Sequence, residues 1–159
     1  MPSRLRVVPG DMFAVRLAAD QYAPMQFIVR DSSQLSSDVV VIYSSRFSSV
    51  DDLRRALPNG GSISFYTHTS VAVGEKAGWW ERVGSAPVPA IDLLFRATDD
   101  VASQVARSDR WYYWRANGEY QDIGRLSDKY AGAEVGLVFG PPAVVERIRT
   151  GELTHRFPN

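Results

Sequence analysis

The chain has 159 residues, 45% of them hydrophobic and 23% charged, which is the balance of an ordinary globular protein. Eighteen basic and eighteen acidic residues give a formal net charge of zero, which argues against a dedicated nucleic-acid-binding protein. There is no cysteine, so disulfides, thiolate metal sites and a cysteine nucleophile are excluded. We expect one domain over 1–159, with an ordered core from 10 to 150, a lead-in at 1–9 and a loose tail at 152–159.

The absence of cysteine also suits a cytoplasmic protein. No apolar run approaches the ~20 residues of a membrane span. The first residues are basic, but they lack the apolar stretch and small-residue cleavage site of a signal peptide. We therefore expect a cytoplasmic protein that makes no membrane contact.

The first half of the chain alternates strands and loops. Alternating apolar residues predict a strand at 10–17 and a return strand at 22–30. The Ser-rich stretch 31–38 predicts a surface loop, and the β-branched run 39–43 predicts a strand buried on both faces. Ser48 or Ser49 can cap a short helix at 50–57, because Asp51 and Asp52 then lie in its first turn.

The second half continues with short elements. Strands are predicted at 63–68, 79–83, 91–96 and 135–139, and a terminal helix begins near Pro142 and ends at Gly151. The segment 71–78 fits a helical turn or a loop, and 99–106 fits one or two helical turns. Seven or eight strands in runs, with two or three short helices, predict an α+β fold with a mainly antiparallel, strongly curved sheet.

Residues 111–123 form the most aromatic stretch. Asn117-Gly118 between two aromatic runs predicts a β-hairpin with a type I′ turn. Tyr112 would then lie opposite Ile123, and Trp114 opposite Gln121. This register assigns Tyr112, Trp114 and Ile123 to a core face. It assigns another set to the opposite face, which would meet solvent or a partner: Tyr113, Arg115, Tyr120 and Asp122.

Catalytic and cofactor patterns are weak. The two histidines, His68 and His155, do not have metal-ligand spacing, and no nucleophile elbow or phosphate-binding glycine loop occurs. His68 could still act as a base beside a serine or a carboxylate, but a structural role fits it better. We predict no catalytic residue, no metal and no cofactor.

Adjacent aromatic residues cannot all point into the core of a strand, so some must face outward. Exposed aromatic residues could stack on nucleic-acid bases, but four basic and five acidic residues around them do not make a basic groove. Aromatic residues beside arginine are also typical of protein–protein contacts. The predicted partner-binding residues are Trp79, Trp80, Tyr113, Arg115, Tyr120 and Asp122.

The order of these motifs resembles the immunity protein 26 family of bacterial polymorphic-toxin systems. The opening Gly10-Asp11-Met12-Phe13-Ala14-Val15-Arg16-Leu17 is similar to that family's first strand. Further similarities follow in order: the strand that ends at Tyr43, the helix through Asp51-Asp52-Leu53, the stretch 78–84 with its two tryptophans and the proline pair after it, the aromatic hairpin and the Pro-Val-Val-Glu-Arg helix. The chain departs from the family at Arg16 and at Ala23-Pro24, and it is rich in Arg rather than Lys.

The resemblance implies a non-catalytic protein that binds and neutralises a cognate bacterial toxin, and it carries over no catalytic residue. Two alternatives stay open. One is a nucleic-acid-binding module on a small β-barrel-like sheet, which net zero charge disfavours. The other is a small hydrolase that uses His68, which would have to lie in a cleft beside a nucleophile or an acid.

Overall fold

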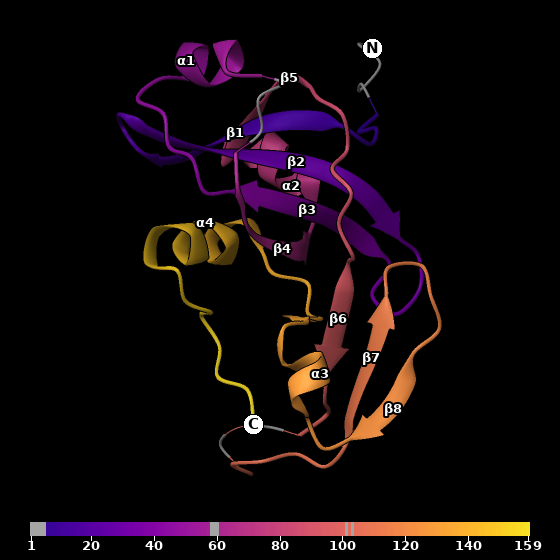
Figure 1. The fold of residues 1–159 in the computed structure, drawn as a ribbon. Coiled ribbons are helices and arrows are strands. Elements are labelled where there is room, and N and C mark those ends of the chain that lie inside the picture. Colours follow the sequence, from indigo (N-terminus) through magenta and orange to yellow (C-terminus); the bar gives the residue numbers. More distant parts are fainter. Residues whose placement is uncertain (1–5, 58–60, 101, 103) are drawn as a thin grey trace.

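A computed structural model describes residues 6–57, 61–100, 102 and 104–159 (Figure 1). These residues contain nine strands and four short helices, and the predicted α+β class is confirmed. The strands are β1 (Asp11–Ala18), β2 (Gln21–Asp31), β3 (Ser37–Tyr43), β4 (Ile63–Thr69), β5 (Trp80–Ser85), β6 (Leu94–Ala97), β7 (Trp111–Arg115), β8 (Gln121–Gly124) and β9 (Glu134–Val135). The helices are α1 (Val50–Arg55), α2 (Val71–Ala77), α3 (Asp128–Ala131) and α4 (Pro141–Thr150).

Two sheets replace the single curved sheet and the seven or eight strands that the sequence predicts. The large sheet has the order β4-β3-β2-β1-β5 and is antiparallel throughout. The small sheet has the order β8-β7-β6-β9, in which only the β6–β9 pair is parallel. In Figure 1 the small sheet lies below the large one, and the loop between β5 and β6 leads from one to the other.

The large sheet is buried on both faces, as the β-branched run of β3 predicts. On one face Val40 and Ile42 join a core that includes Val144 and Ile148 of α4. On the other face Val41 packs in a second core with residues such as Met12, Val83 and Leu53 of α1. Both faces of β3 therefore contribute to stability, although helices cover each face only in part.

Local capping explains the two helices that pack beside this sheet. Ser49 accepts a hydrogen bond from the Asp52 amide at the start of α1, as predicted. The segment 71–78, which fits a turn or a loop from sequence, is the helix α2, with Ser70 at its N-cap and Gly78 in a left-handed conformation at its C-cap.

The C-terminal segment 152–159, which we expect to be loose from sequence, makes several contacts. Leu153 and Phe157 pack against the large sheet's core. The Asn159 amide and carbonyl form hydrogen bonds with Ala106 and Ser108, both at 2.9 Å. Of the predicted lead-in at 1–9, residues 1–5 lie outside the described residues, as do residues 101 and 103 of the predicted helical turns at 99–106.

Candidate functional site

The aromatic hairpin forms, but its register differs by one residue from the predicted one. Tyr112 lies opposite Asp122, and Tyr113 lies opposite Gln121. Asn117 has a φ of 62°, whereas Gly118 is not among the residues with positive φ, so the turn is not type I′. The Gly118 amide instead donates to the Arg115 carbonyl at 2.7 Å, and this closes a turn around Ala116 and Asn117.

Asn117 is held by the end of β2, and this explains the altered turn. Its side-chain amide donates to the Arg30 carbonyl at 2.9 Å and accepts from the Ser32 amide at 2.8 Å. Its backbone amide donates to Asp31 Oδ1 at 3.0 Å. Three hydrogen bonds to another part of the chain thus outweigh the local preference of Asn-Gly for a type I′ turn.

Asp31 is the centre of this junction, and its side chain has no exposed surface. Oδ2 accepts from His68 Nε2 at 2.8 Å and from Trp114 Nε1 at 3.1 Å. Oδ1 accepts from the Asn117 amide and from both the amide and the hydroxyl of Ser33. The carboxylate therefore receives five hydrogen bonds and ties β2, β4 and the hairpin together.

Burial alone would raise the pKa of the Asp31 carboxyl, but the hydrogen bonds from its partner residues outweigh burial and hold that pKa well below its usual range. For His68, burial is the larger effect and lowers the pKa from 6.5, although Asp31 opposes the shift. At neutral pH the pair is therefore a carboxylate that accepts from a neutral imidazole. Nε2 carries the proton, and Nδ1 is a buried acceptor with no hydrogen-bond partner.

This geometry bears on the hydrolase alternative. His68 has the acidic partner that the alternative requires, and its Nδ1 is unprotonated, as a general base would need. However, the side chain of His68 has no exposed surface. A substrate could reach Nδ1 only if the two sheets separated, so the arrangement supports a structural role for His68.

A series of aromatic rings runs from this junction to the surface. His68 contacts Phe95 with ring centroids 4.1 Å apart, and Phe95 stacks on Trp114 at 5.7 Å. Trp114 stacks on Tyr112 at 5.8 Å, and Tyr112 meets Tyr120 edge to face at 5.6 Å. Tyr120, at the outer end of the series, is 53% exposed.

The altered register splits the predicted partner-binding face, because a shift of one residue moves a strand's side chains to the other side of a sheet. Tyr120 and Asp122 lie on the side of Tyr112, not on the side of Tyr113 and Arg115. The assignment of these four residues to one face is therefore wrong. The structure instead gives two faces, each with one pair.

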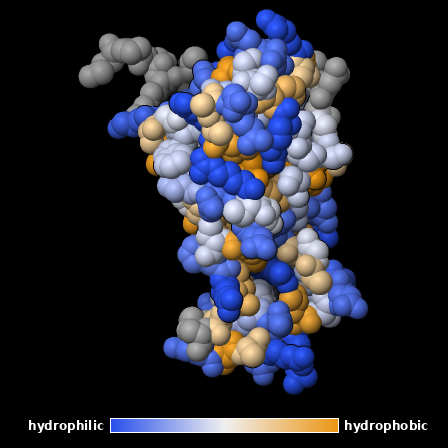
Figure 2. Space-filling model, turned by 90° about the vertical axis from the view of Figure 1, so that its left-hand side faces the viewer, coloured by the Kyte–Doolittle hydropathy of each residue, from blue (hydrophilic) through white to orange (hydrophobic). Residues whose placement is uncertain are grey.

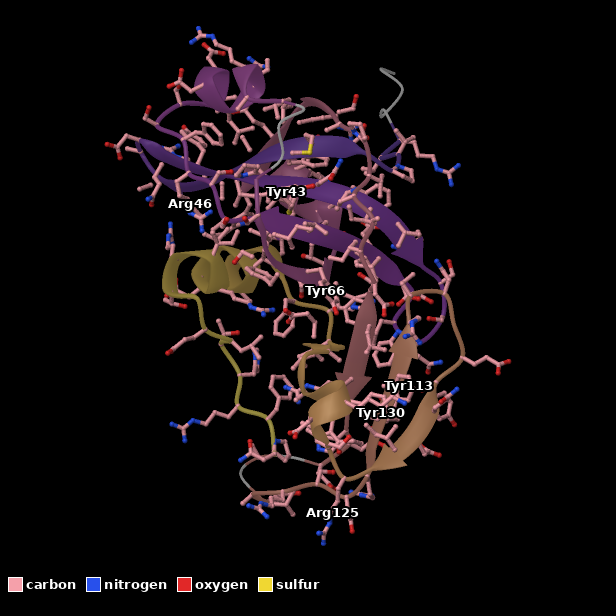
Figure 3. The ribbon with its side chains drawn as sticks, in the orientation of Figure 1. Tyr43, Arg46, Tyr66, Tyr113, Arg125 and Tyr130 are labelled. Carbon is pink, nitrogen blue, oxygen red and sulfur yellow. The ribbon has the colours of Figure 1, made fainter. Side chains whose placement is uncertain are left out.

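Tyr113 and Arg115 lie on the side that α3 covers. Tyr113 contacts Tyr130 of α3 with ring centroids 4.4 Å apart, and the two side chains lie close together in Figure 3. Arg115 forms an ion pair with Asp92 at 2.9 Å. Lys129 lies 5.2 Å above the Tyr130 ring, so this side combines stacked tyrosines with cations.

The two predicted tryptophan contacts belong to the large sheet. Trp80 is 2% exposed and its indole donates to the Val71 carbonyl at 3.0 Å, so it is a core residue and the prediction that it contacts a partner is wrong. Trp79 is half-buried and lines a shallow hollow of about 410 Å³ with Leu17 and Arg149. Trp79 is thus on a surface separate from the hairpin.

Among the described residues, no group of three or more His, Asp or Glu side chains could hold a metal ion. None of the helices in the described part of the chain is both long and apolar enough to span a membrane. Comparisons with protein-family models, with curated proteins and with solved structures each found no match to this chain.

Proposed function

We propose that this chain is a non-catalytic immunity protein that binds a cognate bacterial toxin through the small sheet and so neutralises it. One observation carries the proposal: Tyr120 is 53% exposed, yet its ring rests on Tyr112, which is itself stacked on the buried Trp114. Tyrosine supplies a large contact area at a small cost in side-chain entropy, and fixed aromatic residues of this kind often dominate binding energies.

The anchoring of Trp114 supports this reading. Its indole is bonded to Asp31, and Asp31 also binds the turn of the hairpin through Asn117. The exposed tyrosine therefore stands on a support that is fixed at two points before any partner arrives. Such preorganisation lowers the entropic cost of binding. The finer features of the proposal, a cytoplasmic location and a toxin as partner, come from the composition and from the resemblance.

Co-expression with the product of the neighbouring gene tests this proposal. We expect the chain to restore growth to cells that produce that toxin and to bind it in solution. The Tyr120→Ala variant should bind at least tenfold more weakly, since a central aromatic contact contributes about 2 kcal/mol or more. Val73→Ala is the matched control, because Val73 is 54% exposed on α2 and belongs to another surface. The proposal is overturned if the unaltered chain neither restores growth nor binds the toxin.

A second candidate function is single-stranded nucleic-acid binding, which the contact of Tyr113 with Tyr130 beside Arg115 and Lys129 favours. A fluorescently labelled oligonucleotide should then bind at 50 mM salt and be released steeply as salt rises, because phosphate contacts displace counterions. Lack of binding at low salt removes this candidate.

A further inference from the structure

The side of the small sheet that presents Tyr120 also presents two carboxylates. Asp122 lies opposite Tyr112 in the β7–β8 pair and is exposed. Asp99 follows β6 and is also exposed. Burial raises the pKa of Tyr112, and the negative charge of Asp99 raises it further. Within the part of the chain that the structure describes, neither carboxylate makes a hydrogen bond or an ion pair. We call Tyr112, Tyr120, Asp99 and Asp122 the acidic face.

The cation just before β7, Arg110, is already paired. Arg110 lies two residues before Tyr112, and its guanidinium is bonded to Asp100. Asp100 also accepts from the Ser108 hydroxyl at 2.6 Å. Arg110 is thus bonded to Asp100 rather than to Asp99 or Asp122. Among the described residues, Asp99 and Asp122 therefore keep their negative charge available to a partner.

The opposite side of the small sheet carries a positive charge, and its polar side chains already have hydrogen-bond partners. Its cation Arg115 is bonded to Asp92 through two nitrogens, at 2.9 and 3.2 Å. Its tyrosine Tyr113 is engaged with Tyr130 and donates its hydroxyl to Gln121. The polar groups named on that side therefore already have partners within the chain. On the acidic face, by contrast, the two carboxylates form no hydrogen bond or ion pair among the described residues, and the Tyr120 ring remains 53% exposed although it contacts Tyr112.

We infer that the acidic face is the docking surface and that it selects a protein partner whose contact surface is rich in arginine and lysine. An arginine side chain can stack on a tyrosine ring and donate to a neighbouring carboxylate, so exposed Tyr120 beside Asp122 offers both contacts together. Negative charge on this face repels phosphates, which disfavours nucleic acid or an anionic membrane here. The inference rests on the proposed function and adds the chemistry of the partner to it. Figure 2, which faces the left-hand side of Figure 1 and so the side away from β8, shows hydrophobic and hydrophilic residues side by side at the lower end of the molecule.

The test compares two double charge reversals in binding to the neighbouring gene's product, measured at 50 and 300 mM salt. Asp99→Lys/Asp122→Lys changes the acidic face. Asp20→Lys/Glu81→Lys is the matched control, because it makes the same change in net charge at two exposed positions, one in the β1–β2 turn and one on β5 of the large sheet. Circular dichroism and thermal melting establish that both variants remain folded.

We expect the acidic-face variant to bind at least tenfold more weakly at 50 mM salt and the control variant to bind within about twofold of the unaltered chain. We also expect the unaltered chain to lose affinity at 300 mM salt and the acidic-face variant to lose much less, since its attraction is already gone. If the unaltered chain binds and both variants bind equally well, the inference is overturned and the proposed function stands. If the unaltered chain itself neither binds nor rescues growth, the proposed function fails and the inference fails with it.

Discussion

Replacing Asp31 with Asn should destabilise the fold more than any other single isosteric change at a carboxylate. The amide keeps one oxygen but places an NH2 group where the second oxygen was. If the NH2 takes the place of Oδ2, it meets donors from His68 and Trp114. His68 can change its tautomer and accept, but the Trp114 indole can only donate. If the NH2 takes the place of Oδ1, it meets the backbone amides of Ser33 and Asn117, which also can only donate.

At least one buried donor thus loses its acceptor in either orientation, which costs about 1–3 kcal/mol. The hydrogen bonds that remain also weaken, because their acceptor is no longer charged. Together we expect a loss of about 3–5 kcal/mol, the range seen when one member of a buried charged network is removed. That is a large part of the roughly 5–15 kcal/mol by which a domain of this size is stable.

Urea unfolding followed by tryptophan fluorescence measures this loss. Asp92→Asn is the control, because it removes the same charge from an ion pair with Arg115 in which both side chains are 61% exposed, and it should have only a small effect. A second expected sign is a red shift of the folded-state fluorescence in Asp31→Asn, as Trp114 loosens from the junction. If both variants unfold at the same urea concentration, Asp31 does not hold the two sheets together.

Two further predictions concern packing and pH. Gly74→Ala should cost about 1–3 kcal/mol in urea unfolding, because a Cβ there would lie 1.9 Å from the Trp80 ring, and a variant more stable than the parent would show that helix propensity outweighs this overlap. The free energy of unfolding should also fall in two stages as the pH is lowered. Because the pKa of His68 in the folded protein lies below 6.5, its contribution to the free energy of unfolding is complete above that pH and declines as pH falls below it. The lowered pKa of Asp31 adds a second loss of stability below about pH 3.8. Urea midpoints measured from pH 8 to pH 3 check this, and a midpoint that rises between pH 7 and pH 5 would contradict it.

Features that depend on neighbouring residues could be predicted from the sequence. The alternation in β1 and the β-branched run of β3 gave strands close to those observed. The cap at Ser49 and the Pro and Gly at the ends of α4 likewise mark helices that form. Each of these signals acts over a few residues, so tertiary packing changes only the boundaries of the elements.

The division into two sheets and the hairpin register could not be predicted in this way, because both depend on distant partners. Asp31 is separated from Trp114 by 83 residues and from Asn117 by 86. The polar stretch 31–38 predicts an exposed loop, whereas Asp31 ends β2 as a buried residue. One feature of the sequence does point to a buried Asp31: it lies two residues after Val29, so the alternation of inward-facing residues in the strand can continue to it. The shift of one residue that Asn117 then imposes is enough to move Tyr120 and Asp122 to another face.

The chemistry of the Asp31 junction also explains why a charge is kept at a place where apolar residues could pack. A buried carboxylate is costly to desolvate, and a hydrophobic replacement of similar size can be as stable. Apolar packing would, however, select no particular turn, whereas the carboxylate accepts from Trp114 Nε1 and from the Asn117 amide and so fixes the turn from which β8 begins. Because a shifted register would turn Tyr120 and Asp122 away from Tyr112, the junction determines which residues the small sheet presents to a partner. We therefore regard the buried Asp31 as a positioning residue for the acidic face. The free energy that its desolvation costs is offset by a single, fixed arrangement of the binding surface.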